Sequence, residues 1–451
     1  MADISDAAAM GNESRKQISP TFIAIILLAV RGFAALAMAL STLLMAWVLT
    51  PDEMGIALTL ISAAMLASIP ISLNVEMGAM RFLTAARRDK RDDIIHGFLH
   101  FSSRIITALS VPIMLGFAAL MAIFAVGSAS LAGVAIAACM IPLMAITRST
   151  ARQAGALNHV IRGGMPQLII RPILVLLSLT MAVLSGLRLT IETVLLLFFV
   201  GTAVTALIQK LLLAPILEPI KSALIDDTNA PEWAVTGLRL TPSLLFQDLL
   251  RDLIIVLAAL GLIADSAGIL AVCLAIILVP NLALIAIEIG FGPQISTAMT
   301  QSNDSRLKEL LRQSAILRLL SVLPAFILIQ IFCIPMLSFF GPEYRSGETS
   351  LRILALIPVT KAIFGNPTLL LNIAGHSKVI LKITSMGLVI LAISVPVAAV
   401  LFGIVGAGVA ATSGFWFTQY WLYTACGRSE VADPSAFIFF RRADDVASAK
   451  A

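Results

Sequence analysis

Three basic residues lie deep inside long apolar segments of this chain: Arg31, Arg251 and Lys361. An ionised side chain near the bilayer midplane costs roughly 2.5–3.5 kcal/mol on insertion scales, so such residues face a partner or a water-filled cavity. Each is about ten or more residues from the nearest end of its apolar segment, which is too far for snorkelling. We expect all three to bind an anion, because the planar guanidinium of arginine suits phosphate especially well.

Two acidic residues accompany Arg251 in its segment. Asp248, Arg251 and Asp252 follow the i, i+3, i+4 spacing that places side chains on one face of a helix. One interpretation is an ion pair that stabilises packing. The other is a cavity face on which the two carboxylates titrate as ion-coupling groups while the arginine meets the substrate. A second carboxylate is not needed for neutralisation, and this favours the cavity interpretation.

Glu76 and Glu288 lie near the inner ends of two apolar segments. They are candidates for a gate, and a structural role at the membrane interface is the alternative. No metal site and no cofactor are expected. The four cysteines lack CxxC spacing, and the four histidines lack the spacing of metal ligands.

The elements that position these residues must be membrane-spanning helices. Of the 451 residues, 59% are hydrophobic and only 13% charged, and the mean hydropathy is +0.99. Soluble domains are less apolar and about twice as charged. Many apolar runs reach the roughly 20 residues that a helix needs to cross a bilayer. Almost none alternate with period two, which argues against a transmembrane barrel. The sequence predicts an all-α integral membrane protein.

The apolar runs predict about twelve transmembrane helices, with both termini cytoplasmic. Of the 31 lysines and arginines, only Arg188 and Arg345 fall in loops on the opposite side. This asymmetry also explains the net charge of +5 without a nucleic-acid partner. The predicted spans are residues 20–49, 55–78, 98–125, 129–150, 166–186, 189–213, 241–262, 266–290, 314–337, 349–372, 378–402 and 403–426.

The spans divide into two lobes of six helices. A faint repeat relates them: Asp52-x-x-Gly55 opens one span and Asp265-x-x-Gly268 opens its counterpart, and Glu76 and Glu288 follow at similar distances. Two related halves are typical of transporters that bind substrate between them. The predicted segments are an N-terminal tail (1–19), an N-lobe (20–217), a cytoplasmic linker (218–240), a C-lobe (241–426) and a C-terminal tail (427–451).

Several loose motifs in this order resemble the polysaccharide transporter family, the Wzx-type O-antigen and exopolysaccharide flippases of the MOP superfamily. They are Leu49-Thr-Pro-Asp-Glu-Met-Gly-Ile, Gly341-Pro-Glu-Tyr344, Leu371-Asn-Ile-Ala-Gly375 and Gly403-Ile-Val-Gly-Ala-Gly408. The resemblance runs from about residue 20 to 426. It implies two lobes that alternate between inward- and outward-facing states around a cationic central cavity. It also implies that the first and seventh helices, which carry Arg31 and Arg251, line that cavity.

The sequence therefore favours a flippase that carries a polyprenyl-pyrophosphate-linked oligosaccharide across the bacterial inner membrane. Membrane lipids, glycosyltransferases and a polysaccharide polymerase are the partners that the resemblance implies. A MATE-type multidrug exporter of the same fold is the alternative, although cationic drugs would favour a more acidic cavity. A membrane saccharide polymerase or ligase ranks last, because the predicted outer loops are short and lack paired carboxylates. We expect a transporter, not an enzyme.

Overall fold

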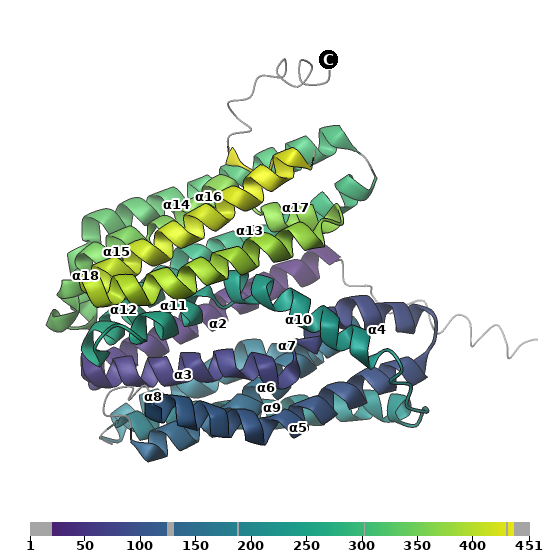
Figure 1. Ribbon diagram of the computed structural model, residues 1–451, viewed down its shortest axis with the longest axis horizontal. Helices are drawn as coiled ribbons and strands as arrows, with labels where there is room; N and C mark the ends of the chain where they lie inside the picture. The colour runs from purple at the N-terminus through teal and green to yellow at the C-terminus, as the bar shows by residue number, and fades with distance from the viewer. Residues whose placement is uncertain (1–19, 124–129, 187–188, 302, 430–431, 437–451) are drawn as a thin grey trace, which may run out of the picture.

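The computed structural model describes residues 20–123, 130–186, 189–301, 303–429 and 432–436 (Figure 1). These residues form helices and no strand. The helices are α2 (Pro20–Val48), α3 (Pro51–Ser72), η1 (Val75–Gly78), α4 (Ala79–Arg88), α5 (Asp92–Ile123), α6 (Leu131–Ala156), α7 (Val160–Met165), η2 (Pro166–Ile170), α8 (Arg171–Leu184), α9 (Ile191–Lys221), α10 (Ala230–Gln247), α11 (Leu250–Ala259), α12 (Ala264–Ile276), α13 (Leu278–Thr300), α14 (Asp304–Phe340), η3 (Pro342–Gly347), α15 (Glu348–Leu354), α16 (Leu356–Phe364), α17 (Pro367–Ile373) and α18 (Ser377–Arg428).

The all-α membrane fold predicted from the sequence is confirmed. Eight helices of the described residues are long and apolar enough to cross a bilayer, or nine if Pro342–Phe364 and Pro367–Ile373 form one bent span. Helices lie within every predicted span, and the protein is a multi-pass membrane protein. The number of twelve spans, the cytoplasmic termini and the two-lobe boundaries stay predictions. The N-terminal tail and most of the C-terminal tail lie outside the described residues.

The last long helix, α18, is a hairpin of two antiparallel arms. It turns at Gly403, whose φ of 61° and ψ of −146° are open to glycine and not to other residues. The arms pack closely, since a Cβ on Gly387 would lie 2.3 Å from Thr418 Oγ1 and one on Gly414 would lie 2.6 Å from Leu391 Cδ2. The predicted boundary between residues 402 and 403 therefore coincides with the turn.

Breaks in several helices have local causes. The bend of 41° before α17 falls at Gly365 and Asn366, directly before Pro367. In α14 the backbone leaves helical geometry at Phe332, with φ −101° and ψ 20°. Pro335 follows three residues later, and its ring clashes with the carbonyl one turn before it.

Two helical groups are arranged one above the other in Figure 1. Helices α3, α5, α6, α8 and α9 form the lower group, and α13 to α18 form the upper group. Helices α2, α10, α11 and α12 lie between them, where α2 contacts α8 and α13 while α3 contacts α11 and α12. The interface between the groups is therefore built largely around α2 and α3.

The tightest contact of this interface joins two glycines related by the sequence repeat. A Cβ on Gly55 of α3 would lie 2.0 Å from the carbonyl oxygen of Ala264, and one on Gly268 of α12 would lie 2.1 Å from that of Pro51. The two helix starts therefore pack backbone to backbone. Helix α3 begins at Pro51 because Thr50 and Glu53 form a capping box there.

The predicted linker, residues 218–240, contains parts of two helices. Helix α9 continues to Lys221 and α10 already begins at Ala230. Trp233 of α10 is 1% exposed and packs edge-on against Phe98 of α5, with ring centroids 5.1 Å apart. The start of α10 is thus anchored by aromatic contacts on the N-terminal half.

Candidate functional site

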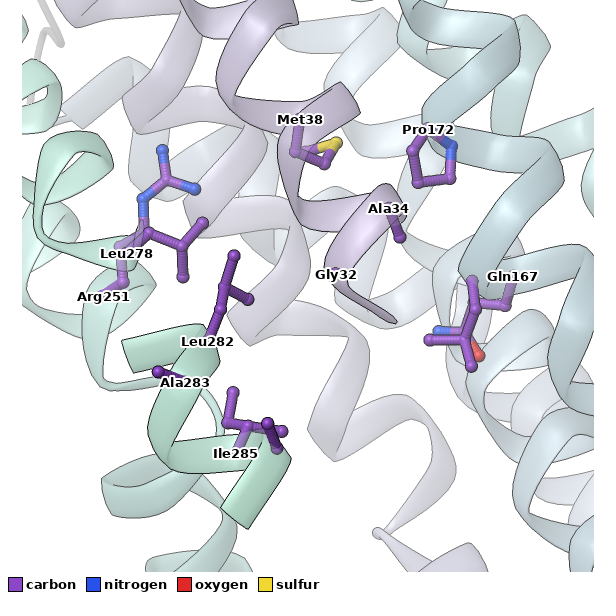
Figure 2. A pocket seen from close by; sticks show the side chains of 12 residues that line it. Gly32, Ala34, Met38, Gln167, Pro172, Arg251, Leu278, Leu282, Ala283 and Ile285 are labelled. Carbon is purple, nitrogen blue, oxygen red and sulfur yellow. The ribbon is translucent and has the colours of Figure 1, made fainter. Parts of the chain in front are cut away.

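An apolar cavity has Arg251 on its wall. Its volume is about 580 Å³. Its lining comes from α2, η2, α8, α11 and α13: Gly32, Ala34, Met38, Gln167, Leu168, Pro172, Arg251, Leu278, Leu282, Ala283, Ile285 and Ala286. Figure 2 shows Arg251 on one side of the cavity and Gln167 on the other. These two are the polar side chains of an otherwise apolar wall.

The Arg251 guanidinium is incompletely paired. Its Nε is buried and has no hydrogen-bond partner in the described structure. A buried donor of this kind is rare in folded proteins and invites an explanation. Because the group also carries a full positive charge, an anionic ligand in the cavity would satisfy both requirements.

A second cavity, of about 470 Å³, has polar walls. It brings together three predicted site residues, Asp248, Glu288 and Lys361, from α10's end, α13 and α16. Amide and hydroxyl groups complete the polar lining: Gln247, Asn281, Asn366, Thr368 and Gln419. Arg152 of α6 also lines it and forms an ion pair with Asp248, with Nη2 and Oδ2 3.1 Å apart.

The two cavities are joined by a small pocket of about 110 Å³. It shares Arg251, Leu278 and Ile285 with the apolar cavity. It shares Asp248 and Lys361 with the polar cavity. The result is one tract that is apolar at one end and polar at the other, with Arg251, Lys361 and Asp248 where the two meet.

The predicted common face of Asp248, Arg251 and Asp252 is wrong. The helix breaks between α10 and α11, where the amide of Leu249 donates to the carbonyl of Leu244, five residues back. Asp248 therefore lines the polar cavity, whereas Asp252 interacts electrostatically with Arg251 and bonds to α3. The Asp252 carboxylate accepts a hydrogen bond of 2.8 Å from the Ser62 hydroxyl of α3. No proline or glycine lies at the break, so the i, i+3, i+4 spacing of the three residues gave no sign of it.

Arg31 lies in α2, but its side chain is outside the described part of the structure. The backbone of α2 still lines the apolar cavity one residue later, at Gly32. A role for Arg31 in binding stays a prediction.

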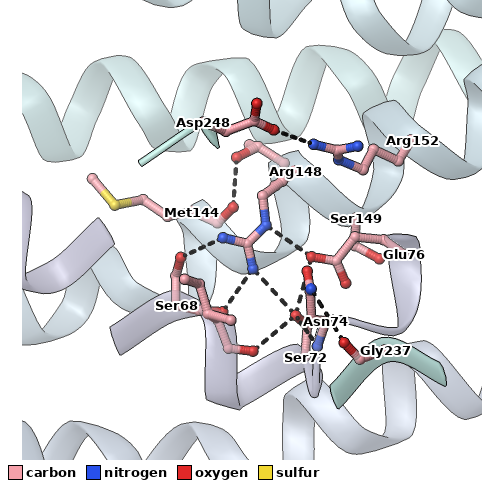
Figure 3. A network of polar contacts seen from close by, with 12 residues as sticks. Ser68, Ser72, Asn74, Glu76, Met144, Arg148, Ser149, Arg152, Gly237 and Asp248 are labelled. Carbon is pink, nitrogen blue, oxygen red and sulfur yellow. Dashed lines mark hydrogen bonds and ion pairs between the residues drawn. The ribbon is translucent and has the colours of Figure 1, made fainter. Parts of the chain in front are cut away.

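Glu76 belongs to a buried network that lies beside the Arg152–Asp248 ion pair of the polar cavity, and Glu76 itself lines none of these cavities (Figure 3). Its Oε1 lies 2.8 Å from Nε of Arg148, and the side chains of the pair are 0% and 6% exposed. Arg148 also donates to the hydroxyl and carbonyl oxygens of Ser68, at 3.1 and 3.0 Å, and to the Ser72 hydroxyl. The network ties α6 to the end of α3 and to η1, all within the N-terminal half. A gating role for Glu76 stays a prediction.

No protein-family profile and no curated protein sequence matches the chain. Solved structures do match. An inward-facing multidrug resistance MATE family transporter of the MOP superfamily superposes with a TM-score of 0.68 and 12% identity, covering 90% of this chain and 99% of the other. The lipid II flippase MurJ, inward closed, gives 0.67 and 12%, covering 89% and 87%. The chain has the fold of the MOP superfamily transporters.

A third structure of this fold is a MOP superfamily transporter from Pyrococcus furiosus, in which a reverse polarity of the binding pocket suggests a different function. Its TM-score is 0.56 at 11% identity, covering 91% of this chain and 95% of that one. In this chain the polarity changes along the tract itself.

Sequence reasoning missed Arg152, Gln247 and Gln419 as cavity residues of this MOP fold. Gln419 carries a recognisable signal, because it is a buried amide in the middle of an apolar span. Arg152 carries none, since its position predicts one of the cytoplasmic positive charges. Only the fold brings it opposite Asp248.

Arg318 of α14 is buried within the protein. It is 5% exposed, and its Nη2 donates a hydrogen bond of 2.8 Å to the carbonyl oxygen of Pro434. That carbonyl also packs against Gly365, where a Cβ would lie 2.1 Å from it. Residues 434–436 are buried, so a short piece of the C-terminal tail docks beside the α16–α17 bend.

Proposed function

We propose that the protein is a flippase that moves a polyprenyl-pyrophosphate-linked oligosaccharide across the bacterial inner membrane for surface polysaccharide biosynthesis. The observation that carries the proposal is the tract described above. Its apolar and polar cavities, of about 580 and 470 Å³, meet at Arg251 and Lys361. A lipid-linked saccharide has the same order of parts: an isoprenoid chain, an anionic linkage and a polar sugar.

The apolar cavity suits part of the lipid chain. Its lining is aliphatic apart from Gln167 and Arg251, and it lies between α2, α8 and α13. Burying the methyl-branched chain against such a wall stabilises binding by roughly 25 cal/mol per Å² of apolar surface. A ligand without a lipid chain would leave this cavity unfilled.

The junction suits the pyrophosphate. Arg251 offers an unpaired buried Nε there, and Lys361 lines the same small pocket. Charge-assisted hydrogen bonds from a guanidinium to phosphate are roughly twice as strong as neutral ones. Arg31, on α2, is proposed as a third contact from the other lobe.

Transport would proceed by alternating access of the two halves around this tract, without a covalent step. Asp248 and Asp252 are proposed to couple it to an ion gradient. The Ser62–Asp252 hydrogen bond supports this for Asp252, because the bond joins α3 to α11 across the interface and depends on the carboxylate. Asp248→Asn and Asp252→Asn should each change the pH dependence of transport. Unaltered transport at every pH would refute the coupling.

A MATE-type cation-coupled multidrug exporter is the second candidate. Asp248 and Glu288 in the polar cavity could bind a cationic drug, and this observation favours it. The unpaired donor on Arg251 opposes it, since a cation cannot satisfy a donor. Glycosyltransferases and a polysaccharide polymerase are proposed partners of the flippase only.

The test is a deletion strain, examined for polyprenyl-linked oligosaccharide, surface polysaccharide and drug susceptibility. We expect the lipid-linked saccharide to accumulate and the surface polymer to be lost. The wild-type gene should remove the accumulation and restore the surface polymer, whereas Arg251→Ala and Arg31→Ala should do neither. Lys308→Ala, at an exposed position of α14, serves as the control and should act like the wild type in both measurements. Unchanged polysaccharide with increased drug sensitivity would overturn the flippase and favour the exporter.

A further inference from the structure

Two amide oxygens of the polar cavity have no hydrogen-bond partner in the described structure. They are Oε1 of Gln419 on α18 and Oδ1 of Asn281 on α13. Both atoms are buried, and Gln419 as a residue is only 6% exposed. Buried amide oxygens are nearly always paired in folded proteins, so two in one cavity point to a ligand that supplies donors.

The orientation of Asn281 is fixed by its own helix. Its Nδ2 donates a hydrogen bond of 3.0 Å to the carbonyl oxygen of Ile277, one turn earlier. The amide oxygen at the other side of the group has no partner in the described structure. A group held in place in this way loses little freedom when a ligand binds.

The charges of the cavity wall balance. Arg152 and Asp248 form an ion pair, and Lys361 interacts electrostatically with Glu288. Asn366 lies beside the same Glu288 carboxylate. With two cations and two carboxylates along its wall, the cavity has no excess charge to attract an ionised sugar.

We infer that this cavity binds an uncharged sugar residue that bears hydroxyl or N-acetyl groups, and that Gln419 and Asn281 are specificity-determining residues for it. The inference rests on the proposed function and names the sugar next to the anionic linkage. Hydroxyl and amide N–H groups donate to amide oxygens, whereas an ionised phosphate or carboxylate offers only acceptors. A volume of about 470 Å³ is also far larger than a single ion requires, since one water occupies about 30 Å³.

The experiment measures binding to the full chain in nanodiscs with three synthetic lipids. They are polyprenyl pyrophosphate, the same lipid carrying one N-acetylhexosamine, and the same lipid carrying one hexuronic acid. We expect the wild type to prefer the N-acetylhexosamine lipid to both others. Gln419→Leu should weaken binding of that lipid roughly two- to tenfold, the effect of one lost hydrogen bond, and leave the bare lipid unchanged.

Two variants make the comparison specific. Arg251→Ala should weaken the binding of all three lipids alike. Gln294→Leu, at an exposed glutamine of α13 outside the cavity, should leave the binding of all three lipids unchanged. If Gln419→Leu does not fold, Asn281→Leu makes the same test from another helix.

The outcomes separate the two proposals. Equal binding of the bare and N-acetylhexosamine lipids by wild type would overturn the sugar site and leave the flippase standing. Tighter binding of the hexuronic acid lipid would overturn the uncharged sugar. Retention of full selectivity by Gln419→Leu and Asn281→Leu would overturn the roles of these residues. If none of the three lipids binds, the proposed function fails and the sugar site fails with it.

Discussion

Removing one partner of the Glu76–Arg148 pair should destabilise the N-terminal half far more than removing a partner of an exposed ion pair. The side chains of the pair are 0% and 6% exposed, so each charge depends on the other for compensation. Truncating one partner of such a pair costs about 3–5 kcal/mol, because a charge stays buried and uncompensated.

The two truncations should differ in size. After Glu76→Gln, the Arg148 guanidinium keeps its hydrogen bonds to Ser68 and Ser72, so we expect about 3 kcal/mol. After Arg148→Met, the Glu76 carboxylate keeps only the Ser72 hydroxyl, at 3.2 Å, and the loss should approach about 5 kcal/mol. The double variant should lose less than the sum, by up to about 3 kcal/mol.

The assay is reversible unfolding in mixed detergent micelles, followed by tryptophan fluorescence. Arg152→Met is the matched control, because it lies one turn further along α6. Its ion pair with Asp248 is exposed, with side chains 37% and 55% accessible, so its loss should cost less than about 1 kcal/mol. Equal losses for Arg148→Met and Arg152→Met, or strict additivity in the double variant, would refute the reasoning.

Two further substitutions test contacts across the fold. Gly55→Val should lower the thermal midpoint clearly, because a Cβ added there would lie 2.0 Å from the carbonyl oxygen of Ala264. Gly116→Val, with open space around it, should not lower the midpoint. Equal midpoints for the two variants would contradict the contact. Gly365→Ala should push Pro434 away and expose the buried thiol of Cys426. In a variant without the other cysteines, this thiol should then react with a water-soluble maleimide. Continued protection of the thiol would show that the tail docks differently.

Much of the fold could be predicted because each membrane span is a continuous run of apolar residues in the sequence. The runs of apolar residues were enough to place the helices, and the predicted boundary between residues 402 and 403 coincides with the hairpin turn at Gly403. The break between Asp248 and Arg251 could not be predicted. It has no proline or glycine, so nothing in the local sequence distinguishes it from a continuous helix.

The site was predictable only in part, for the same reason. Depth within the membrane singled out Arg251 and Lys361, and the structure places both along one tract. The partners of a charge come from distant parts of the chain. Arg148 is 72 residues from Glu76, and Gln419 meets Asn281 in one cavity only after the whole chain has folded.

The contact between Gly55 and Gly268 also constrains how the chain can change over generations. Each glycine makes room for the backbone of the helix that carries the other. Neither position can acquire a side chain while the opposite helix stays in place. A substitution at one glycine therefore destabilises the fold by the same amount whether or not the other has changed. If the two halves arose by duplication, this pair ties them together, and the two positions should stay glycine as a unit even where the surrounding residues have diverged.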